Sequence, residues 1–464
     1  MAEQVREENK MGTMPIPKLL VQMSLPMMLS MLVQALYNMV DSIFVAQINE
    51  EALTAVSLVF PMQSLMIAIA TGTYVGVNAL LSRDLGRKDF ERANQVAKNG
   101  IFLALCSYIG FATFGTLLAK PFIYFQTDDP LIREYGVQYL TIISILCIGV
   151  YAQMIMERLL QATGKTHFSM ISQMMGAVIN IIMDPILIFG LFGFPALGVK
   201  GAAMATIFGQ MAGMSFGIYA NIKFNKEINI NMKGFRPNIH IIINIYKIGA
   251  PSIVMQAIGS LTTFGMNKIL IQFSSTATAV YGIFFKLNSF IFMPVFGLNN
   301  GMIPIIAYNY GARKKDRIIY TMKICISAGI TIMVCGIAIF WLFTPQLLAM
   351  FNASENMYEI GIPALRIIAI SFSFAGYCIV SGSVFQALGN GVYSLINSIC
   401  RQLVFLLPSA FILANFVGLE ATWWSYPIAE IASALGTTYF LVRIYRQKIA
   451  PLGHENDEHK SELT

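Results

Sequence analysis

Long apolar segments recur along the whole of this 464-residue chain, and they constrain its fold more than any other feature. Each run is about 20 to 30 residues long, which lets a helix cross a hydrocarbon core of roughly 30 Å. Only 12% of the residues are charged, whereas soluble domains carry roughly 25%. The sequence therefore predicts an all-α, polytopic membrane protein.

Breaks at Gly, Pro and charge clusters divide the chain into twelve predicted transmembrane helices. These spans cover residues 17–46, 52–82, 93–119, 131–160, 166–191, 199–223, 241–272, 277–308, 317–344, 356–385, 391–416 and 421–446. Lys and Arg concentrate in alternate connections, after the second, sixth and eighth spans. By the positive-inside rule we expect a multi-pass protein of the cell (plasma or inner) membrane with both termini in the cytoplasm.

The remaining composition argues against several function classes. The net charge of +7 is explained by membrane topology and contact with anionic lipid, so we expect membrane lipid and no nucleic acid among the partners. The six cysteines lie in apolar runs without a CxxC motif, and the four histidines lack ligand spacing. We therefore expect no structural metal and no bound cofactor.

The two halves of the chain are related by a shift of 225 residues. This shift places Pro26 on Pro251 and the stretch "LLQATGK" (159–165) on "VFQALGN" (384–390). A shift of six spans preserves orientation, so the halves are parallel repeats, an architecture in which transporters bind substrate near the membrane midplane. We predict two six-helix lobes related by a pseudo-two-fold axis: residues 1–223, a cytoplasmic linker at 224–240, and residues 241–464 with a polar tail.

Glycines and prolines mark further positions in both repeats. The GxxxG pairs at 72–76 and 297–301 predict close helix packing. Pro26 lies deep in the first span, where a proline frees a backbone carbonyl and kinks the helix. The kink is either a hinge or a static bend, and the sequence leaves both open.

A few ionisable residues lie inside the apolar segments, where they are costly and are therefore treated as functional by default. The acids are Asp41 in the first span, Asp184 in the fifth and Glu430 in the twelfth. Asn180 precedes Asp184 by four residues, so both side chains lie on one helix face.

The repeat shows that the acidic pair belongs to the first half alone. The 225-residue shift places Asp41 on Met266 and Asp184 on Ser409. A requirement of the scaffold would be expected in both copies, so the asymmetry favours a function in the first lobe over simple helix packing.

Two chemistries fit these carboxylates. A buried carboxylate close to a second one binds a proton more readily than it does in water. The same oxygens, together with Asn180 and the hydroxyl of Thr206, are also the hard donors that Na⁺ prefers. The sequence does not separate H⁺ from Na⁺.

The second half carries basic residues near membrane depth. Lys268 and Arg401 are among them, with only Glu430 as an acid. Glu430 is either part of a buried ion pair with one of these bases or in direct contact with a substrate or proton.

Taken together, the twelve spans, Asp41 after a proline in the first helix, and the motif N-x-x-x-D-P at 180–185 resemble the MATE (multidrug and toxic compound extrusion) family, in particular its DinF-like and MepA-like branch. The resemblance covers about residues 15–447. It includes the stretches "DSIFVAQI" (41–48), "LLQATGK" (159–165) and "GVKGAAMAT" (198–206).

The resemblance implies a secondary active transporter that exports amphiphilic, often cationic and aromatic, drugs and toxic organic cations by antiport with H⁺ or Na⁺. The cation site would consist of Asp41, Asn180, Asp184 and Thr206, and Pro26 would be the hinge. We assign six residues to a substrate cavity: Gln34, Tyr37, Asn38, Lys268, Arg401 and Glu430. Acids that a related branch carries in spans seven and ten are missing here, which argues against a cation site in the second lobe.

Two other functions remain as alternatives. A flippase for lipid-linked oligosaccharides would use Lys268 and Arg401 to hold an anionic head group. An enzyme would need a nucleophile with its base, a metal set or a phosphate loop, none of which the sequence offers. We therefore expect no enzymatic activity, and we expect a monomer.

Overall fold

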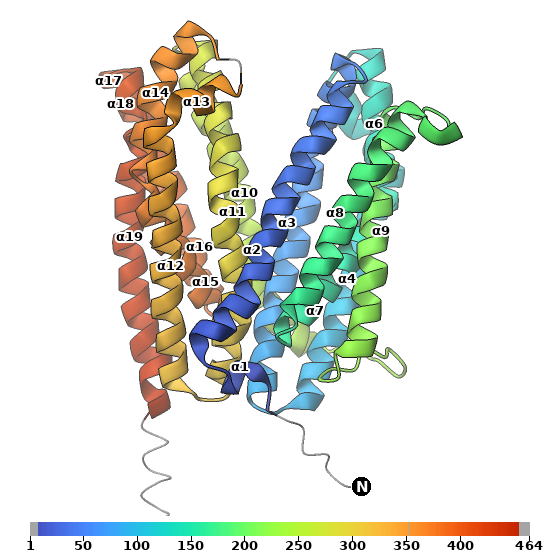
Figure 1. The fold of residues 1–464 in the computed structure, drawn as a ribbon, viewed down its shortest axis with the longest axis vertical. Coiled ribbons are helices and arrows are strands. Elements are labelled where there is room, and N and C mark those ends of the chain that lie inside the picture. The colour runs from blue at the N-terminus through green and yellow to red at the C-terminus, as the bar shows by residue number, and fades with distance from the viewer. Residues whose placement is uncertain (1–7, 352, 454–464) are drawn as a thin grey trace, which may run out of the picture. The chain divides into compact units, whose positions relative to one another are not determined.

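The computed structural model describes residues 8–351 and 353–453. The polar tail predicted after the last span therefore lies outside the described residues, apart from its first positions. Within the described ranges every regular element is a helix (Figure 1). The first repeat contains α1 (Lys10–Thr13), α2 (Ile16–Ala46), α3 (Glu50–Gly86), α4 (Phe90–Leu117), α5 (Ala119–Tyr124), α6 (Pro130–Ile145), α7 (Ile148–Ala162), α8 (Thr166–Phe189), η1 (Leu191–Gly193) and α9 (Val199–Phe224).

The second repeat has a similar succession of helices, except that the counterpart of α8 is divided into three elements. Its elements are α10 (Ile239–Leu270), α11 (Ser275–Gly311), α12 (Lys315–Leu342), α13 (Thr344–Ala349), α14 (Glu355–Ala369), α15 (Phe372–Ala387), α16 (Gly391–Ile399), η2 (Cys400–Leu406), α17 (Leu407–Phe416), α18 (Leu419–Thr422), α19 (Ser425–Ile444), η3 (Tyr445–Ile449) and η4 (Ala450–Gly453). Each of the twelve predicted spans has a helix, or a succession of helices, at its position.

Eight helices within the described residues are long and apolar enough to cross a membrane, and ten if each bent pair counts as one span. The bent pairs are α6 with α7, at 44°, and α14 with α15, at 47°. The sequence predicted one continuous helix at each of these places, so the breaks are new information. The predicted spans at 199–223 and 421–446 correspond to α9 and α19, which are helical but are not among those ten.

The chain divides into two compact units. Unit 1 contains residues 1–28 and 250–464, and unit 2 contains residues 29–249. Helix α2 therefore passes from unit 1 to unit 2 two residues after Pro26, and α10 passes back just before Pro251. The predicted lobes divide the chain by the number of spans, whereas these units divide it by contacts between residues. The lobe boundaries therefore stay a prediction.

The GxxxG glycines hold these long helices against their neighbours, as the sequence predicted. In unit 2, a Cβ on Gly76 of α3 would lie 2.2 Å from the carbonyl oxygen of Ile245 in α10. In unit 1, a Cβ on Gly297 of α11 would lie 2.4 Å from Cα of Met28 in α2. No side chain fits at such distances, so these glycines serve close helix packing.

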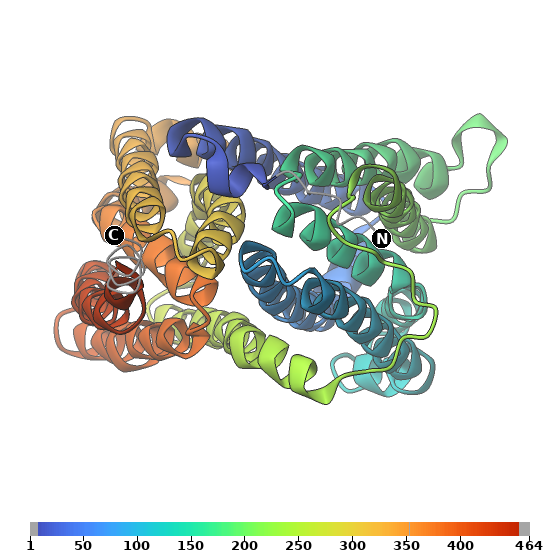
Figure 2. The ribbon, with the colours of Figure 1, turned by 90° about the horizontal axis from the view of Figure 1, so that it is seen from below.

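Apolar side chains fill the interior of unit 2. One buried cluster joins Val45 of α2, Val59 of α3, Tyr139 of α6, Ile188 of α8 and Ala202 of α9. Figure 2 views most helices nearly along their axes, so that their side-by-side packing within each unit is visible. This packing fixes α2, α8 and α9, the three helices that carry the predicted cation site.

Candidate functional site

The four residues predicted as a cation site all lie in unit 2 and come together there. Asp41 comes from α2, Asn180 and Asp184 from α8, and Thr206 from α9. Asp184 has no exposed surface, and Asn180 and Thr206 are buried at 2% and 6% exposure. The carboxyl groups of Asp41 and Asp184 lie next to each other, so that two ionised groups here would repel each other.

The Asn180 side chain links the acid to α9. In the amide orientation that satisfies both of its groups, Nδ2 donates to Oδ2 of Asp184 at 3.2 Å. The amide oxygen then accepts from the backbone N–H of Thr206 at 3.0 Å. The Thr206 hydroxyl donates to the carbonyl of Ala202 at 3.1 Å, one turn earlier in α9. The predicted i, i+4 pairing of Asn180 and Asp184 is thus confirmed.

Small residues bring α9 close enough for these contacts. A Cβ on Gly209 would lie 2.5 Å from the carbonyl oxygen of Gly176 and 3.0 Å from Cβ of Asn180. A Cβ on Gly201 would lie 2.4 Å from the carbonyl oxygen of Leu187. The backbones of α8 and α9 therefore touch on both sides of Thr206, which fixes its distance from Asn180.

Two tyrosines and a glutamine complete the surroundings. Tyr37, which the sequence assigned to a substrate cavity, lies beside both acids. Tyr139 of α6 lies close to Asp41 and to Gln63 of α3. The sequence analysis missed Tyr139 and Gln63, because neither carries a charge and neither stands out from the apolar run around it.

Two carboxylate oxygens of the site are free to bind a proton or a cation. Oδ1 of Asp41 and Oδ1 of Asp184 are buried without a hydrogen-bond partner among the described residues. A buried carboxylate oxygen is costly unless it binds a proton, a hydrogen-bond donor or a cation. The two carboxyl groups, the Asn180 amide and the Thr206 hydroxyl form a set of hard oxygen donors that fits H⁺ or Na⁺.

The other residues assigned to the substrate cavity lie in different units. Gln34 and Asn38 belong to the part of α2 in unit 2, half-buried and exposed respectively. Lys268, Arg401 and Glu430 belong to unit 1. Arg401 Nη1 and Glu430 Oε1 form an ion pair at 2.9 Å, whereas Lys268 is exposed and pairs with neither. Of the two bases considered, Arg401 is therefore the one that pairs with Glu430, and a direct contact of Glu430 with a substrate or proton stays a prediction.

A further buried acid escaped the sequence analysis. Glu157 of α7 is 3% exposed and accepts hydrogen bonds from Gln153 Nε2 and Ser172 Oγ, both at 3.0 Å. Its place near the end of a predicted span, directly before Arg158, resembles that of a loop charge. The repeat offered a signal, because the 225-residue shift places Glu157 on Gly382.

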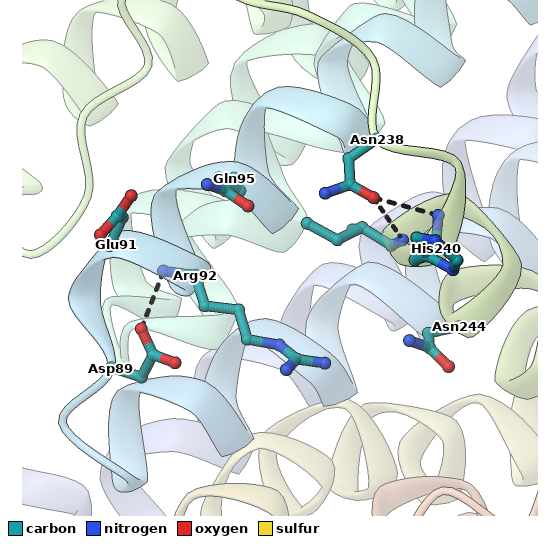
Figure 3. A pocket seen from close by; sticks show the side chains of 8 residues that line it. Asp89, Glu91, Arg92, Gln95, Asn238, His240 and Asn244 are labelled. Carbon is teal, nitrogen blue, oxygen red and sulfur yellow. Dashed lines mark hydrogen bonds between the residues drawn. The ribbon is translucent and has the colours of Figure 1, made fainter.

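A polar pocket of about 300 Å³ lies elsewhere in unit 2 (Figure 3). Asp89 and Arg92 line it from the start of α4, and Asn238 and His240 from the start of α10. Arg92 Nε also lies 3.2 Å from the buried carboxylate of Asp84. Within the described residues, no three His, Cys, Asp or Glu side chains are grouped as metal ligands.

Comparison with known proteins places this geometry in context. A model of the MatE family matches residues 26–186 and 251–412, one segment in each repeat. The chain is 28% identical over 445 residues to the multidrug export protein MepA of Staphylococcus aureus (strain bovine RF122 / ET3-1), which covers 94% of this chain and 95% of that protein.

Solved structures agree with this match. A crystal structure of MATE in complex with MaL6 has a TM-score of 0.89 at 25% identity and covers 96% of this chain and 99% of that one. An outward-facing multidrug resistance MATE family transporter of the MOP superfamily has a TM-score of 0.89 at 26% identity, covering 97% and 99%. The two-lobed, twelve-span fold is therefore shared.

Proposed function

This chain belongs to the MatE family of multidrug efflux transporters, and on that premise we propose that it exports amphiphilic cations in exchange for H⁺ or Na⁺ at the site of Asp41 and Asp184. One observation supports the proposal: the two carboxyl groups lie next to each other inside an apolar lobe, and each keeps a buried oxygen that has no hydrogen-bond partner among the described residues. Asn180, Asp184 and Thr206 hold the site by direct hydrogen bonds across α8 and α9.

Ion binding at this site acts on helix α2. When H⁺ or Na⁺ binds, the repulsion between Asp41 and Asp184 disappears, and α2 is held to α8. When the ion leaves, two like charges face each other in a medium of low dielectric, which favours separation of the helices. The resulting shift in conformation is limited by the difference in ion affinity between the two states.

Pro26 is well placed to respond to this change. It interrupts the hydrogen bonding of α2 two residues before the helix enters unit 2. A bend at this position changes the direction of the part of α2 that carries Asp41, while the preceding turn stays attached to α11 through Ser24, which donates to the carbonyl of Leu298. This location favours the hinge over the static bend.

Gradient-driven efflux tests the proposal. Purified protein is reconstituted in liposomes, a pH or Na⁺ gradient is imposed, and release of a cationic dye such as ethidium is followed. We expect one gradient to drive efflux and both Asp41→Asn and Asp184→Asn to abolish it. Asp128→Asn, which changes a fully exposed acid of the same type, is the matched control and should transport normally. Normal transport by both site variants would refute the proposal.

The proposal also covers the orientation, location and assembly of the protein. We propose that both termini face the cytoplasm, that the protein lies in the plasma membrane as a monomer in contact with lipid, and that it has no enzymatic activity and binds neither a cofactor nor nucleic acid. The concentration of Lys and Arg after the second, sixth and eighth spans supports the orientation. Labelling of single cysteines introduced at exposed positions near residues 127 and 230, from either side of the membrane, would test it.

A further inference from the structure

Two opposite charges lie together inside unit 1, whereas Asp41 and Asp184 belong to unit 2. Arg401 belongs to the π-helix η2 and Glu430 to α19, and both side chains are largely shielded, at 26% and 11% exposure. Arg401 Nη1 donates to Glu430 Oε1 at 2.9 Å. Their surroundings are the apolar segments at 391–416 and 425–444.

The pair leaves polar atoms unused on both partners. Oε2 of Glu430 is buried and has no hydrogen-bond partner in the described part of the chain. A guanidinium carries five N–H donors, and in the same part of the chain Glu430 is the one hydrogen-bond partner of Arg401. A buried ion pair with such gaps stabilises a fold no better than apolar packing of similar volume.

The fold itself does not require the pair. The 225-residue shift places Arg401 on Gly176 of α8 and Glu430 on Ala205 of α9. In the first repeat, the equivalent helices pack in direct backbone contact at Gly176, with no charge at either position. The pair is therefore an addition of the second repeat, which indicates a function rather than a packing requirement.

The backbone around Arg401 is built in an uncommon way. The π-helix η2 covers seven residues, Cys400–Leu406, whereas most π-turns are short and many lie at functional sites. One turn earlier, Asn397 Nδ2 donates to the hydroxyls of Ser433 (3.0 Å) and Thr437 (2.9 Å) in α19. These bonds attach the end of α16 to α19 directly before η2, the π-helix that carries Arg401.

Aromatic rings lie next to the charged groups. Tyr426 precedes Glu430 by one helical turn on the same face of α19. Its hydroxyl donates to that of Tyr281 at 3.1 Å, and its ring lies 5.6 Å from that of Phe284. A ligand bound at Arg401 would thus have the guanidinium, the carboxylate of Glu430 and the ring of Tyr426 within reach.

We propose that Arg401 and Glu430 form a second ligand site, which binds aromatic zwitterions by opening the ion pair. The ligand carboxylate would take two N–H donors of Arg401, because the planar guanidinium matches a carboxylate in two-fold hydrogen bonding. The cationic part would face Glu430, so that neither buried charge loses its partner. The ring system would pack against Tyr426. The proposal goes beyond the exchange function and does not depend on the site of Asp41 and Asp184.

A matched pair of dyes tests it. Rhodamine B is an aromatic zwitterion, and its ethyl ester has the same cationic ring system but no carboxylate. Fluorescence anisotropy titrations with the purified full-length protein in detergent give the affinity for each, corrected for binding to empty micelles. We expect the acid to bind about 10-fold more tightly than the ester, as one charged hydrogen-bonding contact provides.

Variants test whether the preference for the acid over the ester arises from the pair of Arg401 and Glu430. The double variant Arg401→Gln/Glu430→Gln removes both charges together, so no unpaired charge remains inside the protein. We expect it to bind acid and ester equally, with unchanged affinity for the ester. Arg401→Lys keeps the charge but loses the two-fold geometry, and it should reduce the preference several-fold. Lys323→Gln, which removes an exposed charge of α12 in the same unit, should keep it.

Two results would overturn the proposal: equal binding of acid and ester by the intact protein, or an unchanged preference in both Arg401 variants. Asp184→Asn should keep the preference, which separates failure at this site from failure of ion coupling.

Discussion

Replacing Gly209 with alanine adds one methyl group at a close backbone contact between α8 and α9, next to the cation site. The new Cβ would lie 2.5 Å from the carbonyl oxygen of Gly176 and 3.0 Å from Cβ of Asn180. Ordinary contact distances begin near 3.5 Å, so α9 has to move away from α8 by about 1 Å. Because Thr206 lies on α9, its backbone N–H withdraws from the amide oxygen of Asn180.

The expected cost follows from this overlap. Overpacking in a buried contact costs about 1–3 kcal/mol, which corresponds to a decrease in melting temperature of about 1 to 3 °C for a chain of this length. We also expect gradient-driven efflux of ethidium to fall more than stability does, since a shift of about 1 Å at a reacting site has large functional effects.

The control is Gly110→Ala in α4, where a Cβ would have no neighbour within 4 Å. It should be neutral or slightly stabilising, because alanine favours the helix. Thermal unfolding of both variants in detergent and efflux in liposomes provide the measurement. Equal melting temperatures and equal efflux for the two variants would show that contact between α8 and α9 does not hold the site.

Three further predictions follow from single contacts. Thr206→Val removes a hydroxyl but keeps the N–H that donates to Asn180. In Na⁺-driven efflux it should raise the Na⁺ concentration needed for the half-maximal rate. An unchanged Na⁺ dependence would exclude the hydroxyl as a ligand. Pro26→Ala restores a backbone hydrogen bond in α2 and should slow efflux without lowering the melting temperature. An unchanged rate of efflux would indicate that the bend at Pro26 is static. Glu157→Leu leaves Gln153 Nε2 without its acceptor, while Ser172 keeps the carbonyl of Gly213, and it should cost about 1–3 kcal/mol. Glu157→Gln, which keeps an acceptor, should cost less in the same thermal assay, and equal losses would contradict this assignment.

Features that depend on spacing along one helix, or on the repeat, could be predicted from the sequence. Hydropathy located all twelve spans, the shift of 225 residues identified the packing glycines such as Gly76 and Gly297, and the i, i+4 spacing placed Asn180 beside Asp184. Each can be read along the chain without knowledge of which distant segments pack together.

Features that depend on contacts between distant segments could not be predicted from the sequence. The bends between α6 and α7 and between α14 and α15 fall where no proline or glycine interrupts the chain at the break itself. The approach of Tyr139 to Asp41 and the burial of Glu157 depend on which helix faces pack together. The passage of α2 from one unit to the other also follows from packing, because the hydropathy of this helix is continuous.

The central claim is that Asp41 and Asp184 exchange an ion for the substrate. Its most direct test is the release of that ion when ethidium is added to purified protein in detergent, followed with a pH indicator in weak buffer and with a Na⁺-selective electrode. The account predicts release of H⁺ or Na⁺ from the intact protein and from Asp128→Asn, and none from Asp184→Asn. Equal release from Asp184→Asn would show that the coupling ion binds elsewhere.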